Sequence, residues 1–190
     1  MAIKNKQLFI HWPVTGNRAF IEEDYMKPKV LIIMGSDSDL PVMEETTRLL
    51  DDFTVPYTLT VASAHRTPAR TLKLIKDAEK NGVEVIIGAA GMAAHLPGVI
   101  ASHTVLPVIG VPLDASPLKG MDALFSIVQM PHGIPVATVS IGKAGARNAA
   151  ILAVQIMARK DPKLTKKLQD HRQKMAKEVE EKAGRMAKRK

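Results

Sequence analysis

Short apolar runs alternate with longer, mixed stretches across the middle of the chain. The clearest run is Val30–Met34, which contains no polar residue and is followed by Gly35. A run of this kind is typical of a strand that is buried on both faces of a sheet. Four further strands are predicted on the same grounds, at residues 57–62, 83–88, 105–111 and 135–141.

The stretches between and after these strands predict helices. Thr67 followed by Pro68 predicts a helix cap and the first helical residue. Strands that alternate with helices of this length imply βαβ crossovers and a parallel sheet. We therefore predict a three-layer α/β/α domain, with helices at residues 41–53, 68–82, 93–102, 120–130 and 146–159.

The two ends of the chain differ from this middle part. Residues 1–28 have weak periodicity, so we expect an N-terminal extension before an α/β domain at 29–160. Asp161 and Pro162 interrupt the pattern, and residues 161–190 predict an extended basic C-terminal helix. Its apolar residues are candidates for contact with another subunit: Leu164, Leu168, Met175, Val179 and Met186.

Charge and composition narrow the classes of function. The net charge is +8, but residues 30–160 hold 11 Lys and Arg against 11 Asp and Glu, so the excess lies in the two ends. Basic ends with only 4% aromatic residues are more often solvated surface than a nucleic-acid site, and we expect no nucleic-acid partner. No run reaches the roughly 18–20 apolar residues that a membrane helix needs. The absence of cysteine excludes a thiolate nucleophile and suits a cytoplasmic location.

Polar and ionisable residues follow the first three predicted strands. The segments are Gly35–Asp39, Ser63–Pro68 and residues 89–98. Ligands of open parallel sheets bind beyond the carboxyl ends of the strands. We therefore expect these three segments to face one crevice.

Three of these residues suggest a phosphorylated substrate and proton transfer. Arg66 precedes a predicted helix, where a guanidinium can bind a phosphate through two hydrogen bonds. His65 and His95 come from neighbouring loops and suit acid–base catalysis near neutral pH. Each has a structural alternative, because a single histidine is usually structural and Arg66 could pair with Asp77 or Glu79.

The hydroxyl-rich turn after the first strand also has two interpretations. Ser36, Ser38 and Asp39 either cap the following helix or bind an anion and a sugar hydroxyl. Phosphate-loop, dinucleotide, zinc-protease and serine-hydrolase motifs are all absent, so we expect acid–base chemistry without a metal and without a covalent thiol. The remaining histidines have no such neighbours and are interpreted as structural: His11, His103, His132 and His171.

Four sequence segments, in this order, carry a family resemblance. They are Met34–Asp39, Ser63–Pro68, Ala93–Gly98 and Ser126–Pro131, and the stretch 142–150 is also similar. Together they resemble the class I phosphoribosylaminoimidazole carboxylase catalytic subunit, also called N5-carboxyaminoimidazole ribonucleotide mutase. The likeness covers about residues 29–160 and continues into the last helix.

The resemblance implies a flavodoxin-like fold, a homo-octamer, a ribonucleotide substrate and no cofactor. The implied reaction of purine biosynthesis converts N5-carboxyaminoimidazole ribonucleotide (N5-CAIR) into 4-carboxy-5-aminoimidazole ribonucleotide (CAIR), through carbon dioxide held in a closed pocket. His65 and His95 correspond to the catalytic histidines. The expected substrate-binding residues are Ser36, Asp39, Ser63, Ala64, Arg66, Gly91, Ala93 and Leu96.

Two departures and two alternatives accompany this interpretation. Ala89 and Met92 stand where the family commonly has glycine, so the pocket is expected to differ in shape there. Gly91, Ala93 and Ala94 are predicted to wall a small, dry pocket around His95. The alternatives are direct carboxylation of aminoimidazole ribonucleotide, as in the class II enzymes, and a nucleotide-binding module without catalysis.

Overall fold

The protein contains one parallel five-stranded sheet, seen in a computed structural model that describes residues 27–187. The strand order is β2-β1-β3-β4-β5, and every neighbouring pair is parallel. The predicted fold class is therefore confirmed, whereas residues 1–26 of the predicted extension lie outside the described residues. The strands are β1 (Val30–Met34), β2 (Tyr57–Val61), β3 (Val85–Gly91), β4 (Val108–Leu113) and β5 (Ala137–Thr138).

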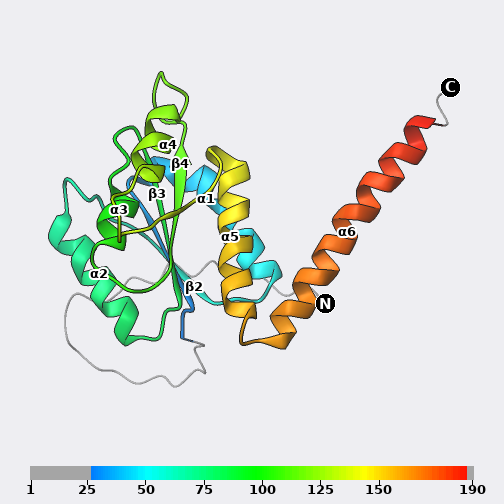
Figure 1. The fold of residues 1–190 in the computed structure, drawn as a ribbon, viewed down its shortest axis with the longest axis horizontal. Coiled ribbons are helices and arrows are strands. Elements are labelled where there is room, and N and C mark those ends of the chain that lie inside the picture. Colours follow the sequence, from blue (N-terminus) through cyan, green and yellow to red (C-terminus); the bar gives the residue numbers. More distant parts are fainter. Residues whose placement is uncertain (1–26, 188–190) are drawn as a thin grey trace.

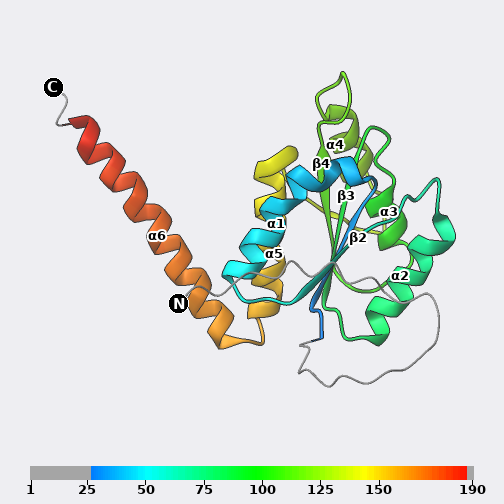
Figure 2. The ribbon, with the colours of Figure 1, turned by 180° about the vertical axis from the view of Figure 1, so that it is seen from behind.

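Helices cover both faces of the sheet (Figures 1 and 2). α1 (Leu40–Asp52) and α5 (Gly142–Ala158) pack on one face, where Met43, Leu50 and Val154 are fully buried. The other face is covered by α2 (Pro68–Lys80), α3 (Leu96–Ala101) and α4 (Met121–Val128). A short 3-10 helix, η1 (Asp37–Asp39), joins β1 to α1.

The central strands are apolar because both of their faces are buried. Along β1, Val30, Ile32 and Met34 enter the core under α1 and α5, while Leu31 and Ile33 enter the opposite core. Successive side chains of a strand point to opposite faces, so a strand between two helix layers needs an apolar residue at every position. This requirement explains the uninterrupted run from which the first strand was predicted.

Three predicted strands differ from the structure by more than one residue at their bounds. β3 extends to Gly91, because the small residues that suggested a loop pair with β4 as far as Leu113. β4 begins at Val108, and Val105 is 98% exposed. β5 has only two residues, whereas a strand over 135–141 was predicted, and its Ala137 and Thr138 pair with Ile109 and Gly110.

α5 begins earlier than predicted, at Gly142 rather than at residue 146. Its Gly145 lies directly against the Ser140 carbonyl oxygen, where an added Cβ would collide with the backbone. Gly145 therefore allows the first turn of α5 to pack against the preceding segment.

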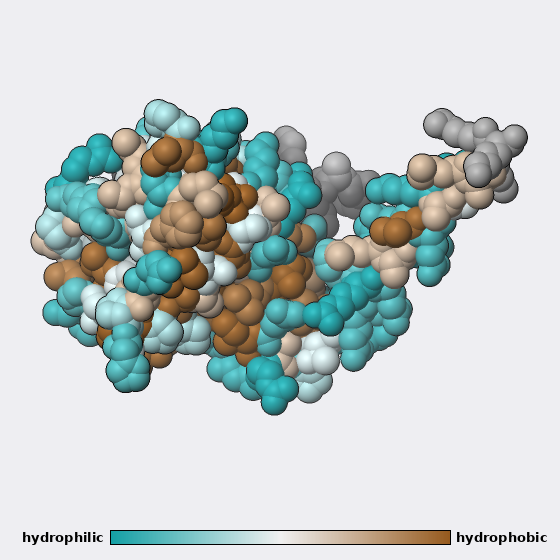
Figure 3. All heavy atoms as spheres, turned by 45° about the horizontal axis from the view of Figure 1, so that its top comes forward, coloured by the Kyte–Doolittle hydropathy of each residue, from teal (hydrophilic) through white to brown (hydrophobic). Residues whose placement is uncertain are grey.

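α6 (Pro162–Ala187) extends away from the domain (Figures 1 and 2). Its first turns are anchored to the end of α1: Lys167 Nζ donates to the Phe53 carbonyl at 2.8 Å, and the rings of His171 and Phe53 lie 5.5 Å apart. Further along, Met175 and Val179 are 51% and 65% exposed, and Figure 3 shows apolar groups among hydrophilic ones on the projecting helix. Contact of this helix with another subunit stays a prediction.

Among residues 27–187, no helix combines the length and apolar character needed to span a membrane.

Glu84 links three elements at the amino end of the sheet. It accepts from Lys29 Nζ and from Lys160 Nζ, each at 3.0 Å, and its side chain is 18% exposed. Burial opposes its ionisation, but the hydrogen bonds from Lys160 and Lys29 outweigh burial and lower the pKa of Glu84.

Candidate active site

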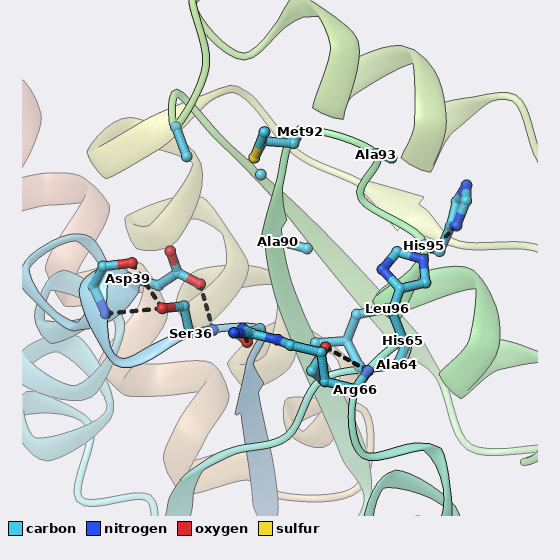
Figure 4. Close-up of a pocket in the computed structure, with 15 residues that line it drawn as sticks. Ser36, Asp39, Ala64, His65, Arg66, Ala90, Met92, Ala93, His95 and Leu96 are labelled. Atoms are coloured by element: carbon cyan, nitrogen blue, oxygen red, sulfur yellow. Dashed lines mark hydrogen bonds between the residues drawn. The ribbon is translucent and has the colours of Figure 1, made fainter.

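A cavity of about 640 Å³ opens at the carboxyl edge of the sheet. The segments after β1, β2 and β3 form most of its wall (Figure 4). All ten residues that the sequence suggested for the site line this cavity, although their roles stay predictions. The lining residues are Gly35, Ser36, Ser38, Asp39, Ser63, Ala64, His65, Arg66, Ala90, Gly91, Met92, Ala93, His95, Leu96 and Ala115.

The two histidines form a direct pair at one end of the cavity. His65 Nε2 and His95 Nδ1 are 2.7 Å apart, and the rings meet edge to face, with centroids 4.9 Å apart and an angle of 79°. At this distance one nitrogen donates and the other accepts, so a single proton lies between the two rings. A proton gained or lost at one ring changes the hydrogen-bonding role of the other, which suits proton transfer.

A compact turn after β3 delivers His95 to this pair. The Met92 carbonyl accepts from Ala94 N at 2.9 Å, and the Ala93 carbonyl accepts from His95 N at 2.7 Å. α3 then begins at Leu96, whose side chain is buried in the core at one edge of the cavity. The buried Leu96 side chain therefore fixes the position of the neighbouring His95 backbone at the edge of the cavity.

A second short loop presents His65 and Arg66. Thr67 is the N-cap residue of α2 and Pro68 is its first residue, as predicted, but the Thr67 side chain makes no capping hydrogen bond to the helix. Instead, Thr67 Oγ1 accepts from Ser63 N at 2.9 Å and donates to the Ser63 carbonyl at 3.1 Å. Ser63 Oγ in turn accepts from Arg66 N at 3.1 Å. These bonds close the loop between Ser63 and Thr67 and hold its tip toward the cavity.

Arg66 reaches across the cavity toward the turn after β1 (Figure 4). Its Nη2 donates to the Gly35 carbonyl at 3.4 Å, a long hydrogen bond that leaves the other donors of the guanidinium for a ligand. The alternative ion pairs are not formed, because Asp77 pairs with Lys73 at 2.6 Å and Glu79 accepts from Thr104 at 2.5 Å.

The polar residues of the turn after β1 cap η1, and their binding of an anion and a sugar hydroxyl stays a prediction. Ser36 N donates to Asp39 Oδ2 at 3.0 Å, and Ser36 Oγ accepts from Ser38 N at 3.3 Å, which caps η1. The same side chains line the cavity. Asp39 is 7% exposed, and burial raises the pKa of its carboxyl against the opposing effect of the Ser36 N–H.

The cavity wall formed by the end of β3 and the loop after β4 is made of very small residues: Ala90, Gly91 and Ala115. A Cβ added at Gly91 would lie 2.6 Å from the Ala115 Cβ, so the loop after β4 approaches the end of β3 as closely as glycine permits. Ala115 carries no reactive group, and its sequence gave no sign of a place in the site, whereas Ala90 belongs to the segment 89–98 that was expected to face the crevice.

Two sequence expectations about this wall are wrong. Ala94 is 1% exposed and belongs to the core under α2, α3 and α4, so it does not line the cavity. Ala89 is fully buried on the other face of β3, so it does not change the shape of the cavity. Alternation along the strand turns Ala89 away and Ala90 toward the site.

Other histidines in the described residues lie outside the cavity. His103 Nδ1 contacts the Val99 carbonyl at 2.8 Å, and His171 packs on Phe53. His132 is exposed, and His11 lies outside the described residues. Within residues 27–187, no three His, Cys, Asp or Glu side chains are grouped so that they could hold a metal ion.

A second cavity, of about 650 Å³, lies at the opposite edge of the sheet. Its lining includes Lys29, Lys160 and Glu84, and these three side chains already form ion pairs with one another. The two cavities have nearly the same volume, so size does not show which of them is the functional site. The chemistry does, because the first one holds the imidazole pair and a guanidinium without a carboxylate partner among residues 27–187.

The fold and this cavity define a class of protein. A parallel three-layer α/β domain presents paired imidazoles, a guanidinium and a hydroxyl-rich turn where its strands end. This combination suits recognition of an anionic small molecule together with proton transfer.

The chain belongs to the AIR carboxylase family, whose sequence profile matches residues 29–178. It is 59% identical over 160 residues to the N5-carboxyaminoimidazole ribonucleotide mutase of Pyrococcus horikoshii, covering 84% of this chain and 89% of that protein. The mutase of Escherichia coli is 50% identical over 151 residues, covering 80% and 89%. A crystal structure of Treponema denticola PurE superposes with a TM-score of 0.76 at 27% identity, covering 83% of this chain and 98% of that chain. The resemblance found in the sequence is confirmed.

Proposed function

We propose that this chain is an N5-carboxyaminoimidazole ribonucleotide mutase, which converts N5-CAIR into CAIR. The observation that carries the proposal is the His65–His95 pair, 2.7 Å apart in the cavity of a chain whose relatives bear this name. The product and the substrate are isomers, so the reaction needs neither an oxidant nor a second substrate.

The reaction requires one proton to be given and one to be taken. When the bond between the exocyclic nitrogen and the carboxylate carbon breaks, carbon dioxide leaves and the nitrogen accepts a proton. The ring carbon C4 then forms a bond to carbon dioxide and loses its own proton. His65 and His95 supply the first proton and accept the second, so the pair returns to its starting state after each turnover.

The substrate is held by the groups on the opposite side of the cavity. Arg66 and Ser36 bind the phosphate, through charge-assisted and hydroxyl hydrogen bonds. Asp39 binds a ribose hydroxyl, since a carboxylate next to a phosphate would be repelled. The walls that enclose the base are contributed by Ser63, Ala64, Gly91, Ala93 and Leu96.

The proposal also covers the oligomeric state, the cellular location, the cofactor requirement and the partners of the enzyme. We propose a homo-octamer in the cytoplasm that uses no cofactor and has no nucleic-acid partner. The catalytic domain spans 29–160, and α6 contributes contacts between subunits. The exposed Met175 and Val179, which continue the apolar side of α6 beyond its own domain, support this last point.

The test is the steady-state rate of CAIR formation from N5-CAIR by the His65→Asn variant. Loss of the proton-transferring ring should lower kcat by about 10²–10⁴-fold while CAIR still binds. His132→Asn is the matched control, because His132 is exposed and lies outside the cavity. Wild-type activity in His65→Asn would remove this residue from the chemistry.

The same assay separates the two alternatives. An enzyme that carboxylates aminoimidazole ribonucleotide with carbon dioxide but does not turn over N5-CAIR is a direct carboxylase. A wild-type protein that binds CAIR and catalyses neither reaction is a binding module. Either result contradicts the mutase proposal.

A further inference from the structure

Met92 has a backbone conformation that costs energy for a methionine. It follows β3 directly and has a φ of 56°, in the left-handed region that favours glycine. Thr54 also has a φ in this region, at 59°. Its hydroxyl oxygen accepts a hydrogen bond from Lys167 Nζ at 2.9 Å. Glycine would adopt the conformation of Met92 without a steric cost. The turn itself therefore gives no reason for a methionine side chain at this position.

The strained conformation is part of the turn that delivers His95. The Met92 carbonyl accepts from Ala94 N at 2.9 Å, the next carbonyl accepts from His95 N at 2.7 Å, and α3 follows. Such strain persists where the surrounding structure determines the backbone, and it is concentrated at functional sites. The backbone of Met92 thus serves the histidine pair, and the role of its side chain is a separate question.

The Met92 side chain lies where the cavity has its smallest walls. It lines the cavity on the side opposite Arg66 (Figure 4), next to Ala90, Gly91, Ala93 and Ala115. It is 59% exposed, whereas Leu96, the other large apolar residue of the lining, is 2% exposed and fixed in the core. Met92 is therefore the one large apolar side chain of the described lining that is free to change its position.

We propose that Met92 retains carbon dioxide in the cavity between the two steps of the reaction. The inference rests on the proposed mutase function. After the nitrogen–carbon bond breaks, carbon dioxide is uncharged and has no net dipole, so walls hold it better than hydrogen bonds do. The Met92 side chain forms no bond in either step. It folds over the part of the cavity that is lined by Ala90, Gly91, Ala93 and Ala115. There it covers the freed carbon dioxide and keeps water out until C4 forms its new bond.

The experiment follows the carboxylate of N5-CAIR labelled with carbon-14, in unlabelled bicarbonate with carbonic anhydrase to dilute any escaped carbon dioxide. The measured quantity is the fraction of label lost per CAIR formed. Met92→Gly should lose label about fivefold more often than the wild type, as expected for removing an apolar side chain that covers part of the cavity. Its melting temperature should not fall, because glycine relieves the strain at a φ of 56°.

Two controls make the result specific. Met92→Leu keeps an apolar side chain of similar size and should retain label nearly as well as the wild type. Met121→Ala removes an exposed methionine from α4, outside the lining, and should not change retention. If Met92→Gly proves difficult to prepare, Met92→Ala is expected to change retention in the same direction.

The possible failures can be distinguished. A wild-type enzyme that forms no CAIR from N5-CAIR overturns both the mutase function and the role of Met92. A wild-type enzyme that forms labelled CAIR, with equal label loss in Met92→Gly, leaves the function standing and overturns the inference. Equal label loss with an altered sedimentation coefficient would assign Met92 to a subunit contact and also overturn it.

Discussion

Gly91→Ala is a minimal change that should displace one wall of the cavity. The added Cβ would lie 2.6 Å from the Ala115 Cβ, whereas methyl carbons in contact are about 3.8 Å apart. The loop after β4 must therefore move outward by about 1 Å. Overpacking of this kind costs about 1–3 kcal/mol, and the exposed position of Ala115 places this case near about 1 kcal/mol.

The effect on catalysis should exceed the effect on stability. A displacement of about 1 Å in the wall of a site can lower activity by up to about 100-fold, and we expect kcat/KM for N5-CAIR to fall at least about tenfold. Activity is measured by CAIR formation, and stability by thermal unfolding.

A second substitution tests the cause of the loss. In Gly91→Ala/Ala115→Gly the colliding Cβ is gone, and the nearest remaining atom is the Leu113 carbonyl oxygen at 3.3 Å. The double variant should therefore recover most of the activity, and Ala115→Gly alone should resemble the wild type. Unchanged kcat/KM in Gly91→Ala, or a double variant no better than the single one, would refute the close-approach argument.

Three further substitutions test individual side chains. Arg66→Ala should raise KM about 30-fold, equivalent to about 2 kcal/mol of charge-assisted binding, in steady-state assays; an unchanged KM would remove Arg66 from the site. Asp39→Asn removes a carboxylate whose pKa is raised by burial, so it should raise the melting temperature at pH 7 and raise KM about tenfold. The thermal gain should shrink as the pH falls through the raised pKa and vanish below the ordinary value of 3.8, and a gain that persists there would contradict the assignment. Glu84→Gln removes a carboxylate whose pKa is lowered, so it should cost about 1 kcal/mol of unfolding free energy at pH 7. That difference should disappear as the pH falls below 4.5, and a pH-independent loss in urea unfolding would contradict it.

The fold was predictable where burial alone determines the sequence. Val30–Met34 is continuous because both of its faces are covered, and its predicted bounds match β1. The end of β3 was missed because Ala89, Ala90 and Gly91 have low strand propensity and pair only through the context of β4. β5 was overestimated because only Ala137 and Thr138 pair with β4, whereas Val136 packs against the core under α2, α3 and α4.

The site was predictable where residues carry chemistry. His65, Arg66 and His95 follow consecutive predicted strands, and the topology of a parallel sheet brings them together. Ala115 carries no chemical signal, and it enters the site only through its contact with Gly91, which depends on the approach of two loops. The role of Thr67 was also hidden, because its hydroxyl bonds to Ser63 on its N-terminal side rather than to α2.

The most direct test of the account is a crystal structure of the complex with CAIR. We predict the phosphate at Arg66 and Ser36, a ribose hydroxyl at Asp39, and the imidazole ring of the ligand within hydrogen-bond reach of His65. Electron density for the ligand in the cavity beside Lys29 and Glu84, or in the carboxyl-edge cavity with the imidazole ring turned away from both histidines, would contradict the account.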